Sequence, residues 1–316
     1  MPEIKDGVEI LHAKPVPRPG RWVSAAVVAL LAAMVLRGLV FNPNFQWPIV
    51  WEWLFSRTIM VGVLNTLVLT VLAMVLGTAL AITMAVMRQS PNPILRGVAT
   101  FYIWFFRGTP IYTQLIFWSL LPTLLPTLGL GIPFGPQFFT VTLTTGTTLN
   151  FTLAFIGLGL NEGAYLAEII RSGLLSVDRG QWEAATALGM HRGKIFRRIV
   201  FPQAMRVIVP PIGNETISML KTTSLVSAIP VTTELTFVAQ TKGQQLFAPI
   251  PLLLAAAIWY LVITSILMVV QSQIERHYGR GFDQRAGSGR AATGGGRDAP
   301  GASDTVHVDP FLEVTP

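Results

Sequence analysis

Long apolar runs are the feature of this sequence that most restricts its fold. The clearest of them covers about residues 59–87 and is closed by Arg88. A helix needs roughly 20 consecutive apolar residues to cross the hydrocarbon core of a bilayer, and this run exceeds that length. Hydrophobic residues make up 51% of the chain and charged residues only 12%, whereas soluble domains carry about a quarter charged residues. The sequence therefore predicts an all-α membrane protein.

Five further segments have the composition of membrane spans. Together with the first run they predict about six transmembrane helices, at about residues 22–41, 59–87, 110–125, 149–170, 204 to between 222 and 229, and 249–271. Pro210 and Pro211 lie in the fifth span, where we expect them to kink the helix and free backbone carbonyls. Residues 98–106 are apolar but short, and we expect them to lie along the membrane as an elbow.

The distribution of Lys and Arg orients these spans, because basic residues gather in cytoplasmic loops. The loops that we place inside hold Arg88, Arg96, Arg107, Arg171, Arg179, Arg192, Lys194, Arg197 and Arg198. The loops that we place outside hold only Arg57 and Lys242, apart from Arg37 at a span end. This pattern predicts a multi-pass protein with both termini in the cytoplasm. It also explains the net charge of +7 without nucleic acid, since the basic residues lie at the ends of apolar runs.

Four segments follow from the composition. We expect a cytoplasmic arm at residues 1–21, an additional N-terminal helix and outer loop at 22–58, a membrane core at 59–276, and a disordered tail at 277–316. The charge-free stretch 122–148 suits the outer side of the membrane, as does the segment 230–248.

Several kinds of chemistry are excluded by residue type. There is no Cys, so disulfides, Cys-ligated metals and thiol catalysis are impossible. The four His residues are scattered and lack metal-ligand spacing. Gly193 and Lys194 resemble the end of a phosphate-binding loop, but the required first Gly is Leu188 and the required Ser or Thr is Ile195. The chain therefore carries no recognisable nucleotide site, and we expect no cofactor and no enzyme activity.

Ionisable and amide side chains within the spans are the candidate solute-path residues. They are Glu162, Asn214, Glu215 and Lys221. Such groups are costly in hydrocarbon, so they either line a path for a polar solute or pair internally. For Glu168 and Arg171, three positions apart, we expect a local ion pair. Gly159 and Gly163 form a G-x-x-x-G pair that predicts close helix packing.

The segment 180–202 is the longest water-compatible stretch between spans. Its composition predicts a helix over 183–188, a turn at Gly189, and a basic amphipathic helix over 192–200 that Pro202 stops. It is either a docking surface on the cytoplasmic side or a basic loop that only fixes the topology.

A family resemblance favours docking. The segment is similar to the E-A-A signature of permease subunits of binding-protein-dependent ABC importers, carried here by Glu183, Ala184, Ala185, Gly189, Ile199 and Pro202, with Phe201 in place of the usual Leu. Further motifs resemble those of the subfamily for polar amino acids such as histidine, glutamate, glutamine, arginine and opines. These motifs are Arg107–Pro110, Ala164–Arg171, Gly180-Gln181, Asn214-Glu215 and Lys221–Leu225. In the last of them, Thr222 replaces an acidic or amide residue of the family. The resemblance runs from about Val61 to Arg276.

The resemblance implies a five-helix type I ABC importer core plus one N-terminal helix, in a bacterial inner membrane. The E-A-A segment would be a cytoplasmic coupling helix that docks on an ABC ATPase dimer, with ATP bound by that partner. A second permease copy or similar subunit would complete the path, and an extracytoplasmic solute-binding protein would deliver a polar amino acid. The alternatives are a proton-coupled secondary transporter that uses Glu162 or Glu215 as a relay, and a membrane scaffold without a path.

Overall fold

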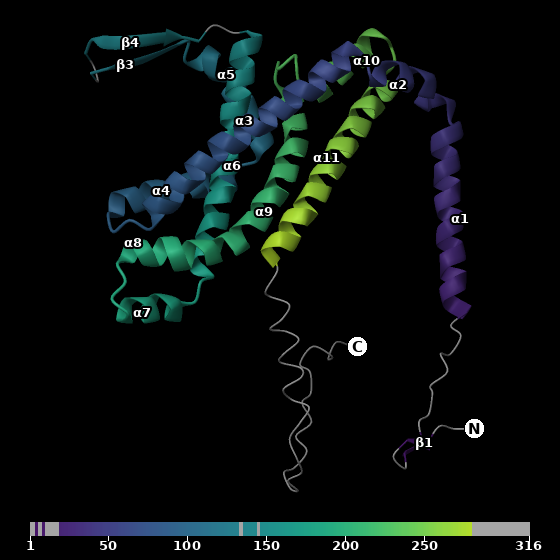
Figure 1. Ribbon diagram of the computed structural model, residues 1–316. Coiled ribbons are helices and arrows are strands. Elements are labelled where there is room, and N and C mark those ends of the chain that lie inside the picture. Colours follow the sequence, from purple (N-terminus) through teal and green to yellow (C-terminus); the bar gives the residue numbers. More distant parts are fainter. Residues whose placement is uncertain (1–3, 6–7, 10–18, 133–134, 144–145, 280–316) are drawn as a thin grey trace, which may run out of the picture.

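The structure is a computed structural model, and it describes all residues except 1–3, 6–7, 10–18, 133–134, 144–145 and 280–316. Helices dominate it (Figure 1). Their bounds are α1 Pro19–Phe41, α2 Trp47–Leu54, α3 Arg57–Arg88, α4 Pro93–Gly108, α5 Ile111–Leu124, α6 Thr147–Leu175, α7 Arg179–Ala187, α8 Arg192–Ile195, α9 Phe201–Thr222, α10 Leu235–Gln245 and α11 Pro249–Gly279. A π-helical turn at Phe196–Val200 joins α8 to α9, and 3-10 turns cover Pro43–Phe45 and Thr223–Ala228.

Two short hairpins complete the described chain. The strands β1 (Ile4–Lys5) and β2 (Val8–Glu9) pair antiparallel near the N-terminus. The strands β3 (Thr127–Gly131) and β4 (Gln137–Thr142) pair antiparallel between α5 and α6, with Leu128 opposite Val141. The second hairpin lies in the stretch for which the sequence predicted only an uncharged outer loop. Most of the predicted tail, beyond residue 279, lies outside the described residues, as does much of the N-terminal arm.

Four described helices are long and apolar enough to cross a membrane: Gly20–Phe41, Arg57–Arg88, Thr147–Leu175 and Pro249–Tyr278. They correspond to the first, second, fourth and sixth predicted spans. The third predicted span corresponds to α5, which has only 14 residues and follows α4 after a break at Thr109 and Pro110. The fifth corresponds to α9, which is less apolar. A count of six spans thus remains a prediction.

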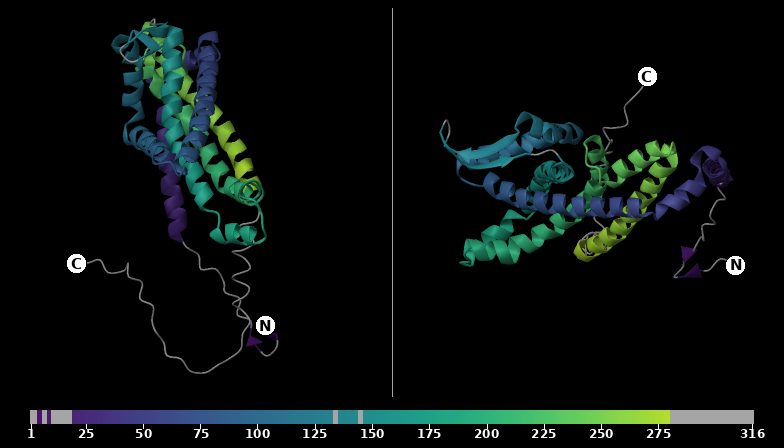
Figure 2. Two further views of the ribbon diagram at one scale, coloured as in Figure 1. Left: turned by 90° about the vertical axis from the view of Figure 1, so that its left-hand side faces the viewer. Right: turned by 90° about the horizontal axis from the view of Figure 1, so that it is seen from above.

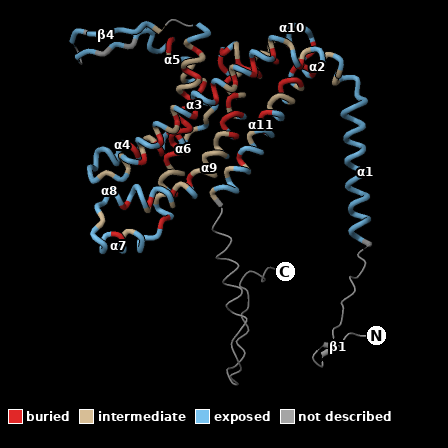
Figure 3. Tube along the Cα trace, in the orientation of Figure 1, coloured by how far each residue is buried: buried red, intermediate tan, exposed pale blue. Residues whose placement is uncertain are grey.

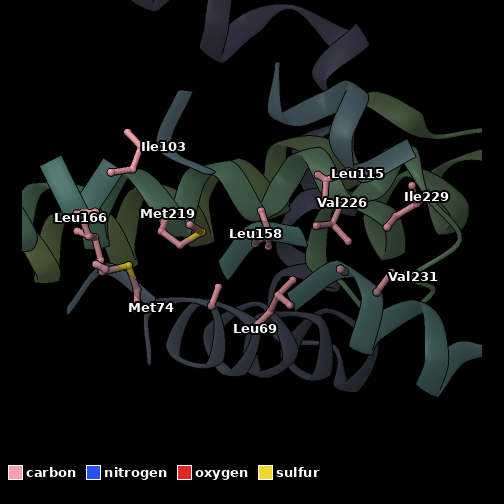
Figure 4. Packing of buried hydrophobic residues seen from close by; sticks show 14 residues of the cluster. Leu69, Met74, Ile103, Leu115, Leu158, Leu166, Met219, Val226, Ile229 and Val231 are labelled. Carbon is pink, nitrogen blue, oxygen red and sulfur yellow. The ribbon is translucent and has the colours of Figure 1, made fainter. Parts of the chain in front are cut away.

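The centre of the bundle is the crossing of α3 and α6. Small residues allow this contact: a Cβ on Gly159 would lie 2.7 Å from Leu76 Cδ2, and one on Gly163 would lie 2.9 Å from Leu80 Cβ. The close packing predicted for the G-x-x-x-G pair is therefore confirmed. Buried side chains from α3, α5, α6 and α9 form one cluster around the crossing, including Leu69, Leu115, Leu158, Leu166 and Met219 (Figure 4).

Helix α1 stands apart from the bundle. Figure 3 shows it exposed along its whole length, and no part of its apolar window is buried. It is connected to the bundle through α2, where Val50 and Leu54 pack against Ala255 of α11. The Trp47 indole N–H also donates a hydrogen bond of 2.9 Å to the carbonyl of Leu39. Because α1 is so apolar, lipid or another membrane helix must cover it.

The basic segment after Gly189 differs from its prediction. Pro202 does not stop a helix, because the helical path continues from α8 through the π-turn into α9. In that turn the Phe201 N–H donates to the carbonyl of Phe196, five residues back. The wider turn accommodates a proline that has no N–H of its own.

The helical assignment of α9 is also unbroken across Pro210 and Pro211. The Gln271 side-chain amide of α11 donates a hydrogen bond of 2.8 Å to the Pro210 carbonyl. A neighbouring helix thus provides a donor beside the two prolines.

The connecting elements collect at two opposite ends of the bundle. Figures 1 and 2 show α7 and α8 at the same end as the start of α1 and the end of α11. The β3–β4 hairpin, α2 and α10 lie at the other end. This arrangement places the strongly basic loop of α7 and α8 at one end and the connections with few basic residues at the other.

Candidate functional site

A polar cavity of about 680 Å³ opens between the corner that joins α4 to α5, helix α6 and helix α9. The corner provides a run of backbone and side chains, and the two helices each provide one carboxylate. The lining residues are Arg107, Gly108, Thr109, Pro110, Ile111, Tyr112, Leu158, Asn161, Glu162, Tyr165, Glu215, Ser218, Met219 and Thr222.

Glu162 is the most unusual group in this cavity. Its side chain is only 5% exposed, and its Oε1 atom has no hydrogen-bond partner among the described residues. Its position is fixed by the α3–α6 crossing, because a Cβ on Gly77 would lie 3.0 Å from the Glu162 side chain. A buried carboxylate without a partner is costly, so this one is suited to receive a donor from a bound solute.

A cation and an aromatic ring face the same cavity. Arg107 lies in the last turn of α4, and its guanidinium carbon is 5.4 Å from the centre of the Tyr165 ring of α6. That distance is typical of a cation–π contact. The cavity therefore combines two carboxylates, Glu162 and Glu215, with one guanidinium that an aromatic ring holds in place.

Two side-chain amides hold the α4–α5 corner against α6. Asn161 donates to the Phe106 carbonyl at 3.0 Å and to Gln114 Oε1 at 3.2 Å. Gln114 Nε2 in turn donates to Thr109 Oγ1 at 2.6 Å and to the Phe106 carbonyl at 3.1 Å. Sequence reasoning did not single out Asn161 or Gln114, although the Arg107–Pro110 motif marked this corner.

The structure divides the four candidate path residues into two pairs. Glu162 and Glu215 line the cavity. Asn214 and Lys221 are exposed side chains of α9 that are not among the lining residues. The cavity thus joins two carboxylates that are 53 positions apart in sequence.

The expected pair of Glu168 and Arg171 is present near the end of α6, and it includes a third member. Arg171 Nε donates to Glu168 Oε1 at 3.0 Å, and Arg88 Nη1 from the last turn of α3 donates to Glu168 Oε2 at 2.7 Å. The contact with Arg88 was not predicted, because nothing in the sequence shows which residues of two spans will meet.

The loop after α6 has the form that its sequence predicted up to Gly189. Asp178 caps α7 by accepting a hydrogen bond of 2.8 Å from the Gly180 N–H. Gly189 has a φ of +72°, which is the left-handed region that favours glycine. The next N–H, of Met190, donates back to the Ala185 carbonyl at 3.1 Å. This turn directs the chain from α7 into α8.

The two faces of this loop differ. Ala185 is 2% exposed and Ile195 is fully buried, and both belong to an apolar cluster with Val200. Glu183 and Ala184 are exposed, and Leu188 at the tip is 82% exposed. The small size of Ala185 thus serves packing within the chain rather than an outer surface. Ile199 is half-buried and Pro202 is exposed.

A helical membrane bundle with a polar cavity between its helices and an exposed basic loop at one end has the architecture expected of a membrane transport protein. Comparison of the chain with known protein families identifies the kind of transport protein. Residues 77–280 match the family described as "Binding-protein-dependent transport system inner membrane component". The chain belongs to this family, and it is a transport subunit rather than an enzyme.

Named relatives agree with this assignment. The chain is 49% identical over 271 residues to the arginine transport system permease protein ArgU of Corynebacterium glutamicum, covering 86% of this chain and 84% of the relative. It is 34% identical to the histidine/lysine/arginine/ornithine transport system permease protein HisM of Escherichia coli, covering 69% and 87%. A crystal structure of an amino acid ABC transporter matches with a TM-score of 0.58 and 33% identity, over 71% of this chain and 95% of that one.

Proposed function

We propose that this chain is the permease subunit of an ABC importer for a cationic amino acid of the arginine type, and that its cavity forms half of the solute path. The observation that carries this proposal is the unpartnered carboxylate of Glu162 in a cavity that also holds Glu215. The names of two relatives, which include arginine transport, support the same substrate class.

The chemistry of the cavity matches the two ends of such a solute. The guanidinium or ammonium group of the side chain would donate to Glu162, which removes the cost of an unpaired buried carboxylate. The Arg107 guanidinium would donate two N–H hydrogen bonds to the solute's α-carboxylate in a bidentate pair. The volume of about 680 Å³ falls within the range of about 300–1,000 Å³ that is usual for small-molecule sites.

The loop at residues 179–202 supplies the coupling in this proposal. Glu183, Ala184 and Leu188 form its outward face, and an exposed Leu beside a small Ala is suited to enter an apolar cleft of an ATPase subunit. Gly189 would set the angle of this helix, while Ile199 and Pro202 would transmit its movement into α9. ATP would be bound by the ATPase dimer and not by this chain.

The remaining parts of the proposal follow from the same assignment. A second permease copy or similar subunit would supply the other half of the path, and a solute-binding protein would dock at the end that carries α2, α10 and the β3–β4 hairpin. The chain would lie in a bacterial inner membrane with α7 and both termini in the cytoplasm. The strongly basic loop and the connections with few basic residues lie at opposite ends of the bundle, and this supports the orientation.

The test is ATP-dependent uptake of labelled arginine by proteoliposomes that contain the permease, its ATPase and its binding protein. Glu162→Gln should lower uptake by about tenfold, since a hydrogen bond to a charged group contributes roughly 1.5–3 kcal/mol. Glu52→Gln changes an exposed carboxylate of α2 outside the cavity and serves as the matched control.

Two results would overturn the proposal. Equal uptake by Glu162→Gln and the control would show that the cavity is not part of the solute path. Uptake that continued without the ATPase and followed a proton gradient would instead support a secondary transporter with a carboxylate relay.

A further inference from the structure

A second cavity, of about 500 Å³, lies at the C-terminal end of α6, between the last turn of α3, the end of α6, helix α7 and the π-turn. It shares no lining residue with the solute cavity described above. Its lining residues are Arg88, Gln89, Arg171, Leu174, Leu175, Val177, Arg179, Trp182, Phe196 and Val200.

The charge of this cavity is strongly positive. Three guanidiniums line it, from Arg88, Arg171 and Arg179, and no carboxylate does. Glu168 accepts from Arg88 and from Arg171, so three positive charges and one negative charge leave a balance of two positive charges. Arg179 makes no ion pair with any residue that the structure describes. The charge of the cavity therefore favours an anionic ligand, and the Arg179 guanidinium is available to bind it.

The walls of the same cavity are apolar. Trp182, Leu174 and Val200 line it, and beside them Leu175 is 67% exposed and Phe196 is 42% exposed. A free inorganic anion gains nothing from such walls. A molecule that carries a phosphate on one end and acyl chains on the other uses both the guanidiniums and the exposed Leu and Phe side chains.

The position of the cavity favours the same kind of ligand. It lies where two long apolar helices end, at Arg88 and Leu175, which is the level at which lipid headgroups meet water. Basic pockets between membrane helices at this level are suited to anionic headgroups. We propose that this cavity binds the phosphate of an anionic phospholipid, with Arg179 and Arg171 on the headgroup and Trp182 and Phe196 against the first acyl carbons.

The location gives this lipid a consequence for the loop. Arg179 begins α7 and Trp182 lies one turn further on, so the bound headgroup joins α7 to the ends of α3 and α6. An anionic lipid therefore holds the loop in place against the bundle. This inference concerns the membrane and the loop, and it stands whichever solute is carried.

The experiment measures lipid that remains bound to the full-length permease, purified with its ATPase partner from nanodiscs. The nanodiscs contain either phosphatidylcholine alone or an equimolar mixture of phosphatidylcholine and phosphatidylglycerol, and retained lipid is counted by native mass spectrometry. The wild-type protein should retain phosphatidylglycerol in preference to phosphatidylcholine. Arg179→Gln should lower that retention by about fivefold, because one basic residue near an anionic membrane surface contributes about 1 kcal/mol.

A matched control and a second readout separate this site from general charge effects. Arg192→Gln removes the same charge from an exposed residue of the same loop that does not line the cavity, and it should leave retention unchanged. Phosphatidylglycerol with brominated acyl chains should quench tryptophan fluorescence in the wild type, and Trp182→Phe should remove that part of the quenching. Loss of retention that is equal in Arg179→Gln and Arg192→Gln would overturn the proposal.

A further arm distinguishes the lipid from a soluble anion with the same phosphate chemistry. Inorganic phosphate or ATP is added to the phosphatidylglycerol-bound protein, and released lipid is measured. The lipid site predicts little release, because neither competitor contacts the apolar walls. Stoichiometric release by either competitor in the wild type, but not in Arg179→Gln, would show that the cavity binds a soluble phosphate. That result would overturn the proposed lipid site.

Discussion

Arg88, at the last turn of α3, lies 2.7 Å from a carboxylate oxygen of Glu168, which is 80 positions further along the chain on α6. The same carboxylate accepts from Arg171. This shared carboxylate joins the ends of two membrane helices that otherwise meet through apolar side chains and glycines. It also lies beside the basic cavity, so it reduces the repulsion between two of that cavity's guanidiniums.

Glu168→Gln tests this junction. The substitution keeps the shape of the side chain but removes its charge, so two guanidiniums then face each other without a carboxylate. Because the side chains are about one quarter to one third exposed, we expect a loss of about 1 kcal/mol in the free energy of unfolding. The measurement is the thermal unfolding midpoint of the purified protein in detergent. An unfolding midpoint equal to that of Glu52→Gln would contradict a stabilising role.

Gly163→Ala tests the close approach of α3 and α6. A Cβ at this position would lie 2.7 Å from the Tyr102 hydroxyl and 2.9 Å from Leu80 Cβ, so the helices must separate or distort. We expect destabilisation of about 1–3 kcal/mol, as for other overpacked sites. Gly97→Ala is the control, because no heavy atom would lie within 4 Å of its Cβ and alanine favours a helix. Equal thermal stability of the two variants would show that the crossing has room for a methyl group.

Hydropathy predicted the long helices of this fold because a span must satisfy its own backbone in lipid. The predicted span at 59–87 is α3, at 57–88, and the predicted span at 149–170 is the interior of α6. It did not predict the β3–β4 hairpin, which lies in a connection without charge, or α10, which carries Glu234 at its cap and Lys242 in its last turn but has no strong apolar periodicity. The prediction that Pro202 stops a helix was also wrong, because a π-turn accommodates here a proline that would usually end a helix.

The cavity was predictable only in part. Glu162 and Glu215 attract notice because carboxylates are rare within apolar spans. Nothing in the sequence shows that α6 and α9 bring these two together, or that Asn161 holds the α4–α5 corner beside them. Asn214 and Lys221 have the same apparent signal, yet they lie on the exposed side of α9. The direction of a side chain depends on tertiary packing, which local composition does not report.

Gly189→Ala tests the turn between α7 and α8. No heavy atom lies within 4 Å of the position that a Cβ would occupy, but the φ of +72° is unfavourable for alanine. We expect a local cost of about 1–2 kcal/mol, with α7 shifted from the angle at which we propose that it docks on the ATPase. The amount of ATPase that co-purifies with the permease should fall, while the permease remains in the membrane.

Two companion variants make this result specific to the backbone. Gly189→Asn should retain more of the ATPase than Gly189→Ala, because Asn tolerates the left-handed region. Gly193→Ala should retain all of it, since its Cβ would meet only ordinary contacts at 3.5 Å or more. An equal amount of co-purified ATPase in all three variants would show that the turn at Gly189 has no role in the proposed coupling.

Glu234 forms the principal polar junction at the opposite end of the described bundle. Its side chain is fully buried and caps α10 by accepting from the N–H groups of Thr236 at 2.7 Å and Phe237 at 3.2 Å. The other carboxylate oxygen accepts from the Thr66 hydroxyl of α3 at 3.0 Å and from the Tyr260 hydroxyl of α11. One carboxylate thus connects three helices.

Glu234→Ala should therefore be among the most destabilising changes in this chain. It leaves several buried donors without an acceptor, and we expect a loss of about 2–4 kcal/mol in the free energy of unfolding. Tyr260→Phe removes one donor and should cost about 1 kcal/mol. Combining the two should cost less than the sum of the single changes, because the Tyr260 hydroxyl has already lost its main acceptor. Thermal unfolding of the four proteins in this cycle measures the coupling, and strictly additive shifts would show that the two side chains do not act as one unit.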